Sequence, residues 1–97
     1  MKLSAELQQS REYIRERVTF YGLSNPRLFG DTIESLDDKD CVEIFILVDT
    51  GPDTSEFEMA GLSEELNEIF SVPVRLGTPG SPSVRTQKEL IPSAVPI

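Results

Sequence analysis

Residues 29–49 read FGDTIESLDDKDCVEIFILVD, which places a glycine turn, an acidic run and an apolar strand one after another. This order is typical of sites that handle phosphate groups, because the backbone N–H groups of a glycine turn can bind an anion. Carboxylates at positions i and i+2 of a strand point to the same side and can hold a divalent cation together. The chemistry open to this stretch therefore depends on which carboxylates stand on the strand.

The chain has no histidine and a single cysteine, Cys41. Zinc sites built on imidazole, Ser-His-Asp triads and histidine general bases are therefore excluded, and any metal would be a hard ion held by carboxylates. A single cysteine forms no internal disulfide, which favours a reducing cytoplasm. Because no histidine is present to activate the thiol, we interpret Cys41 as a structural residue at the start of a strand.

The 97 residues include 9 Lys and Arg against 17 Asp and Glu, a formal charge of -8. This charge repels a phosphate backbone, so we expect the chain to bind no nucleic acid by itself. It would favour a basic partner protein, or simply keep a small domain soluble. The N-terminus lacks a signal-peptide core, and no run approaches the roughly 20 apolar residues of a membrane span. We therefore expect a cytoplasmic protein without membrane contact.

Two helices are predicted from the spacing of apolar residues. The first covers residues 4–21 and ends at Gly22, and the second begins at a capping box formed by Ser55 and Glu58 and continues to residue 70. The first helix is expected to place Leu7, Ile14, Val18 and Tyr21 on its apolar face, and the second Phe57, Leu62, Leu66, Ile69 and Phe70.

Three strands are predicted as well. They cover residues 27–29, which close on Gly30, residues 41–48, and residues 72–76. The sequence CVEIFILV of the second suits a central strand covered on both faces, whereas Pro73 indicates that the third begins at an edge or entry. Residues 31–40 are expected to form a loop or a marginal helix.

Residues 81–97 form a proline-rich C-terminal segment that can hold at most one short helix around residues 83–90, because Pro92 would stop it. The length of the chain allows one domain, over residues 1–97. The order of the elements predicts an α/β (α+β) fold in which helices pack on a small mixed sheet.

With its elements in this order, the chain resembles the minimal nucleotidyltransferases, small prokaryotic members of the DNA polymerase beta superfamily. The resemblance is carried by NPRLFG (25–30), LVD (47–49), GPDTSEFEMAGLSEELNEIF (51–70), VPVRLGTPG (72–80) and AVPI (94–97). No single segment is specific, but the ordered set with its spacing is. The resemblance implies a nucleotidyltransferase-like fold.

The family reads Gly-Ser at its phosphate turn, Asp-x-Asp on the strand that follows, and a third Asp on the next strand. The corresponding positions here are Gly30 and Asp31 for nucleotide binding, and Glu43, Phe45 and Arg75 for catalysis. The phenyl ring of Phe45 cannot coordinate Mg²⁺, and the carboxylate of Asp31 would repel a triphosphate. Arg75 places a positive charge where a negative side chain would be needed to neutralise the metal ions. The resemblance thus implies a degenerate active site with no intact catalytic residue, no metal and no cofactor.

Alternatives remain open for the same residues. A shift of register would make Asp38, Asp40 and Glu43 the metal ligands of a residual nucleotidyltransferase or nucleotide-binding protein that uses Mg and ATP, although DDKD also reads as a solvated linker. Phe45 could simply pack in the core, and Gly30 could simply form a tight turn. Glu43 and Arg75 could form an ion pair in the vacated site, or each point to solvent.

The family that the chain resembles is often encoded beside a small helical HEPN-type protein, and the two act as antitoxin and toxin. We therefore expect a protein-binding, antitoxin-like module, with such a helical protein as its partner. Whether the chain is an enzyme stays open, with the residues favouring no activity. A homo-oligomer held together by exposed strand edges or by the proline-rich tail is a further option.

Overall fold

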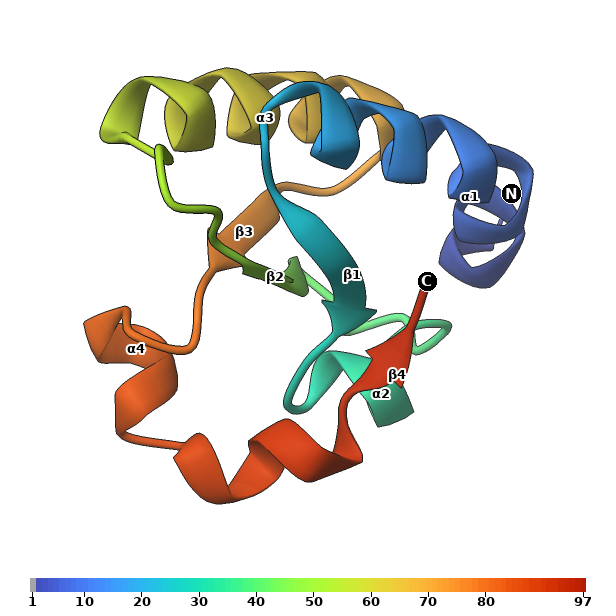
Figure 1. The fold of residues 1–97 in the computed structure, drawn as a ribbon. Helices are drawn as coiled ribbons and strands as arrows, with labels where there is room; N and C mark the ends of the chain where they lie inside the picture. The colour runs from blue at the N-terminus through green and yellow to red at the C-terminus, as the bar shows by residue number, and fades with distance from the viewer. Residues whose placement is uncertain (1) are drawn as a thin grey trace.

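The computed structural model describes residues 2–97, and its helices and strands are drawn in Figure 1. They follow in the order α1 (Leu3–Phe20), β1 (Ser24–Leu28), α2 (Thr32–Ser35), β2 (Ile44–Asp49), α3 (Glu56–Ile69), β3 (Val74–Gly77), α4 (Pro82–Arg85), the 3₁₀ helix η1 (Lys88–Ser93) and β4 (Val95–Pro96). Within this part of the chain, no helix is both long and apolar enough to cross a membrane.

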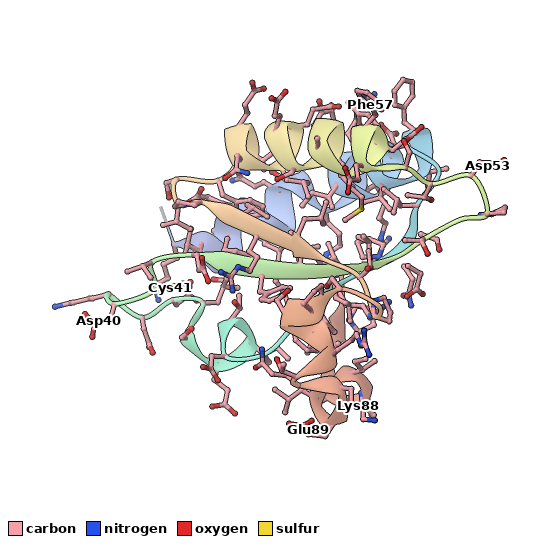
Figure 2. All side chains as sticks on the ribbon, turned by 90° about the vertical axis from the view of Figure 1, so that its left-hand side faces the viewer. Asp40, Cys41, Asp53, Phe57, Lys88 and Glu89 are labelled. Atoms are coloured by element: carbon pink, nitrogen blue, oxygen red, sulfur yellow. The ribbon has the colours of Figure 1, made fainter. Side chains whose placement is uncertain are left out.

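The four strands form one mixed sheet in the order β3-β2-β1-β4. Strands β2 and β3 are parallel, while β1 runs antiparallel to both β2 and β4. Figure 2 shows the sheet from the side, with α1 and α3 over one face and the C-terminal segment under the other. The predicted mixed sheet with helices packed on it is confirmed.

Strand β2 is central, and its side chains alternate between two apolar layers. Ile44, Ile46 and Val48 point toward α1 and α3, where the main core lies. Phe45 and Leu47 point the opposite way, into a smaller cluster. Both faces of the strand are thus buried, as predicted from its nearly continuous apolar sequence.

The main core also confirms most of the predicted helix faces. It includes Leu7, Ile14 and Val18 of α1, Leu62 and Leu66 of α3, and Phe70 just after α3. The capping box at Ser55 and Glu58 is present as well. Gly22 has a φ of 78°, a left-handed conformation that suits glycine and ends α1 where expected.

The prediction for Phe57 is wrong. Its side chain is 89% exposed, whereas Leu62 and Leu66 are fully buried. The helical period gives the reason: Phe57 precedes Leu66 by nine residues, and nine steps of about 100° leave the two on roughly opposite sides of the helix. An apolar residue near a capping box need not belong to the buried face.

Strand boundaries also differ from the prediction. Strand β1 begins at Ser24 instead of residue 27, because Asn25 adopts a φ of 55° that produces a bulge and lets the chain rejoin β2. Strand β2 begins at Ile44 instead of Cys41, so Glu43 lies just before it. Strand β3 begins at Val74, after Pro73, whose carbonyl accepts a hydrogen bond from the Ile44 N–H.

The C-terminal segment contains two short helices instead of one. Pro92 lies inside η1 and does not stop it. In a 3₁₀ helix each N–H bonds three residues back, and here Leu90 donates to Gln87 and Ala94 to Ile91, so the missing N–H of Pro92 interrupts neither bond. The segment then returns to the sheet as β4, and in doing so covers the smaller apolar cluster.

Candidate functional site

A cleft of about 370 Å³ lies where the turn after β1, the segment before β2 and strand β3 meet. The five residues at the positions that correspond to the family's site line it: Gly30, Asp31, Glu43, Phe45 and Arg75. Asp40 and Cys41, which also line it, mark this end of the molecule in Figure 2. The tertiary structure therefore brings together residues that lie up to 45 positions apart (75 − 30) in the sequence.

The turn at Gly30 forms one side of the cleft. Gly30 has a φ of 70°, which residues with a Cβ rarely adopt, so glycine is required here by backbone conformation. Asp31 follows as the exposed N-cap of the four-residue helix α2, and its side chain makes no capping hydrogen bond. The turn has the position expected of a phosphate-binding loop, but it presents a carboxylate to the cleft.

Thr32 connects this turn to the sheet. Its side chain is buried, and its Oγ1 accepts a hydrogen bond of 3.0 Å from the backbone N–H of Phe45. In the sequence, the only signal for Thr32 is a hydroxyl in the first turn after a glycine. Because its partner lies on another element, the role of Thr32 became visible only in the structure.

Glu43, just before β2, and Arg75, on β3, face each other. The parallel register pairs Phe45 with Arg75, and Arg75 Nη1 lies 4.0 Å from Glu43 Oε1. The Arg75 side chain is 55% exposed and the Glu43 side chain is 45% exposed, so solvent screens their attraction. Of the two alternatives, the structure shows a long, solvated ion pair in the cleft.

Phe45 forms the inner wall of the cleft and is only 8% exposed. Its ring packs edge-to-face on Phe29, with ring centroids 5.1 Å apart, and the Arg75 guanidinium lies 5.7 Å from its centroid. Gly77 on β3 leaves room for the ring: a Cβ there would lie 2.8 Å from Phe45 and 3.0 Å from Val84. Phe45 is therefore a packed core residue as well as a cleft residue.

The carboxylates that line the cleft are those of Asp31, Asp40 and Glu43. Among residues 2–97, no group of three or more Asp, Glu or Cys side chains is arranged to hold a metal ion. Asp38 does not line the cleft, although Asp40 and Glu43 do. The guanidinium of Arg75 lies beside Glu43, and its positive charge opposes binding of a metal cation at the same place.

A comparison with solved structures identifies one with the same fold, described as a "putative minimal nucleotidyltransferase". The match has a TM-score of 0.78 and 20% sequence identity, and it covers 100% of this chain and 97% of that chain. No protein family and no curated protein sequence matches the chain. At this identity the match shows the fold alone: the chain is a protein of the minimal nucleotidyltransferase fold.

Proposed function

We propose that this nucleotidyltransferase-fold protein has lost metal-dependent catalysis and acts as a protein-binding, antitoxin-like module. The observation that carries the proposal is the packing of Phe45, whose ring fills the inner wall of the cleft at the position that aligns with the family's second metal-binding carboxylate. A side chain that is part of the core cannot turn aside to admit a carboxylate ligand from elsewhere.

The charges of the cleft support loss of catalysis. Phosphoryl and nucleotidyl transfer depend on positive charge placed at the reacting phosphate, and the loss of even one preorganised donor costs about 3 kcal/mol, or roughly a hundredfold in rate. Here the third ligand position holds Arg75, which is directed toward Glu43, and the phosphate turn carries Asp31. Arg75 replaces a carboxylate that would hold the metal ions, and Asp31 repels the phosphates, so the two departures disfavour transfer for different reasons.

The charge of the whole chain supports binding to a basic protein. At a formal charge of -8, the surface attracts a cationic partner and accelerates encounter with it. The resemblance suggests a small helical HEPN-type protein as that partner, and a protein of this kind that acts on RNA would present a basic surface. Blocking such a surface requires tight binding by a complementary surface, and it requires no catalytic step.

Nucleotide binding distinguishes this proposal from a residual nucleotidyltransferase. We expect no Mg²⁺-dependent rise in the melting temperature with ATP in the millimolar range, because a ligand that binds only the folded state would raise it. A rise that is lost in the Asp38→Asn/Asp40→Asn variant, but kept in an Asp53→Asn control away from the cleft, would establish residual nucleotide binding instead. Transfer of AMP to a co-purified protein would establish residual nucleotidyltransferase activity.

Partner binding is tested by co-expression with the products of adjacent genes, followed by size-exclusion chromatography. We expect one of them, basic and helical, to co-elute with this protein at low salt and to separate at high salt. Failure with every neighbour would contradict the proposal. If the protein alone instead had the mass of a dimer, the self-associating alternative would be favoured.

A further inference from the structure

A second hollow, larger than the cleft, lies at the other end of the molecule. Its volume is about 590 Å³, and it lies between the end of α1, the loop after β2 and the start of α3. We call it the aromatic groove, and its lining includes Phe20, Phe57, Pro52, Asp53 and Glu58 over a floor of Gly22 and Gly51. Figure 2 shows Phe57 and Asp53 at the end opposite Asp40 and Cys41.

The walls of the aromatic groove are apolar side chains that the fold leaves in solvent. Phe57 is 89% exposed and Phe20 is 68% exposed, which makes them two of the three most exposed large apolar side chains among residues 2–97. Single exposed apolar residues are common on protein surfaces, whereas two aromatic rings that line the same concave surface favour a site of interaction. Neither ring contributes to either apolar cluster of the core.

At the floor of the groove, two backbone segments lie in close contact. A Cβ on Gly51 would lie only 2.6 Å from the carbonyl oxygen of Gly22. The loop above the floor is closed by Thr54, whose Oγ1 accepts a hydrogen bond of 2.7 Å from the Gly51 N–H and whose own N–H donates to the Gly51 carbonyl. The groove is thus preformed, which lowers the entropy that a ligand would lose on binding.

The Phe20 wall is held in place by an ion pair behind it. The Arg17 guanidinium lies 4.2 Å from the Phe20 ring centroid and pairs with Glu65 at 2.6 Å. Tyr21 packs edge-to-face on Phe20 and donates its hydroxyl proton to the same carboxylate. Gly61 leaves room for the Tyr21 ring, since a Cβ there would lie 2.7 Å from it. Phe20 therefore has little freedom to fold away from the groove.

The charges around the groove are negative. Asp53 and Glu58 line it, and Glu56 is exposed next to them on α3. The nearby Arg17 is compensated by Glu65, so it does not offset these carboxylates. Two copies of the chain would each carry a formal charge of -8, and the repulsion between them opposes self-association.

We infer that the aromatic groove docks an apolar side chain presented by a lysine- or arginine-rich helix of a partner protein. The apolar side chain enters between Phe20 and Phe57, and the basic residues beside it pair with Asp53, Glu56 and Glu58. The inference rests on the proposed function in that both require a basic partner, but it assigns the contact to the groove and away from the cleft.

The test uses a fluorescein-labelled peptide of about 16 residues, an amphipathic helix of leucine and lysine, titrated with the whole protein. We expect Phe57→Ser and Phe20→Ser/Phe57→Ser to weaken binding about tenfold or more, as for side chains at the centre of an interface. Tyr13 is another exposed aromatic residue but lies outside the groove, so Tyr13→Ser should change the affinity for the peptide less than about twofold. A matched peptide with glutamate in place of lysine should not bind.

Charge gives an independent measurement that keeps the fold intact. Asp53→Lys/Glu56→Lys should weaken binding of the lysine peptide, and raising NaCl from about 50 to 300 mM should weaken it for the unmodified protein as well. Circular dichroism should show no change in any of these variants, because every substituted side chain is exposed.

Three results would overturn the inference: equal affinity of the Phe57→Ser and Tyr13→Ser variants, equal binding of the acidic peptide, or a dimer that Phe57→Ser dissolves. Failure of the proposed function is separate from these. If the natural partner still co-elutes with Phe20→Ser/Phe57→Ser at low salt, the groove is excluded while the partner-binding role stands. If no adjacent gene product co-elutes with the unmodified protein, the role itself fails, whatever the peptide does.

Discussion

The cleft and the aromatic groove lie at opposite ends of the molecule and differ in what their side chains do for the fold. In the cleft, Phe45 packs into the core and Glu43 faces Arg75, so the side chains largely contact one another. In the groove, Phe20 and Phe57 are exposed to solvent and contribute to no core cluster. The cleft thus contributes to the core through Phe45, while the exposed aromatic surface lies at the other end of the molecule.

The largest expected difference between the two regions is in stability. Phe45→Ala should lower the free energy of unfolding by about 3–5 kcal/mol, because it removes a buried ring that Phe29 and Val84 contact. Phe57→Ala, with the same chemical change on an exposed side chain, should stay within about 0.5 kcal/mol of the unmodified protein. Urea denaturation measures both, and equal losses would mean that the two regions do not differ in the way described.

Crowding at Gly77 gives the next effect. Gly77→Ala would place a Cβ 2.8 Å from the Phe45 ring, and the forced repacking should cost about 1–3 kcal/mol in thermal or urea unfolding. Gly80→Ala serves as a matched control, because no atom lies within 4 Å of a Cβ at that position. If the two substitutions proved equally harmless, the ring would not be held in the tight packing that the cleft requires.

A smaller effect is expected from the ion pair behind the groove. The Arg17 guanidinium, followed by the Tyr21 hydroxyl, lowers the pKa of Glu65 below its ordinary value. A carboxyl whose pKa is lower in the folded state stabilises the fold above the unfolded pKa of about 4.3, and this stabilisation is lost as the pH falls through the folded value.

Glu65→Gln should therefore flatten the loss of stability between about pH 5 and pH 2. Melting temperatures measured across this range, with Glu64→Gln as a neighbouring control, test the expectation. Some acid dependence should persist in the variant, because the pKa values of Asp37 and Glu58 are lowered too, first of all by hydrogen bonds from Ser4 and Ser55. A profile identical to that of the unmodified protein would contradict the stabilising role of the pair.

The smallest effect is expected at the ion pair of the cleft. A double-mutant cycle with Glu43→Gln and Arg75→Gln should give a coupling energy of about 0.5 kcal/mol or less, since the two groups lie 4.0 Å apart and are about half exposed. A coupling well above about 1 kcal/mol would show that the pair is less solvated and closer than described, and that it is a main support of the cleft.

Much of the fold followed from local sequence signals. The capping box at Ser55 and Glu58, the glycine that ends α1 and the apolar run of β2 each act over a few residues, and each prediction was confirmed. The resemblance also pointed to Gly30, Asp31, Glu43, Phe45 and Arg75, and the structure places these five at one cleft. Errors arose where a local rule met a longer-range contact: Pro92 is accommodated inside η1, in a segment that packs on the sheet.

The aromatic groove was not predicted, and the reason is physical. Phe57 is apolar and lies in an amphipathic helix, so counting apolar residues assigned it to the core. Strict attention to the helical period would have placed it on the opposite side from Leu66. Even then, nothing in the sequence indicated that Phe20, at the end of another helix, would lie beside the same hollow.

The sequence by itself determined the chemistry of each position: which residues can bind a cation, which turns need glycine, where helices begin, and that the chain is strongly acidic. The tertiary structure decided which of these residues meet. Glu43 faces Arg75 and Phe20 shares a groove with Phe57 only because sheet register and helix packing bring distant segments together. Such contacts depend on the arrangement of whole elements, whereas backbone conformation and side-chain chemistry are set within a few residues.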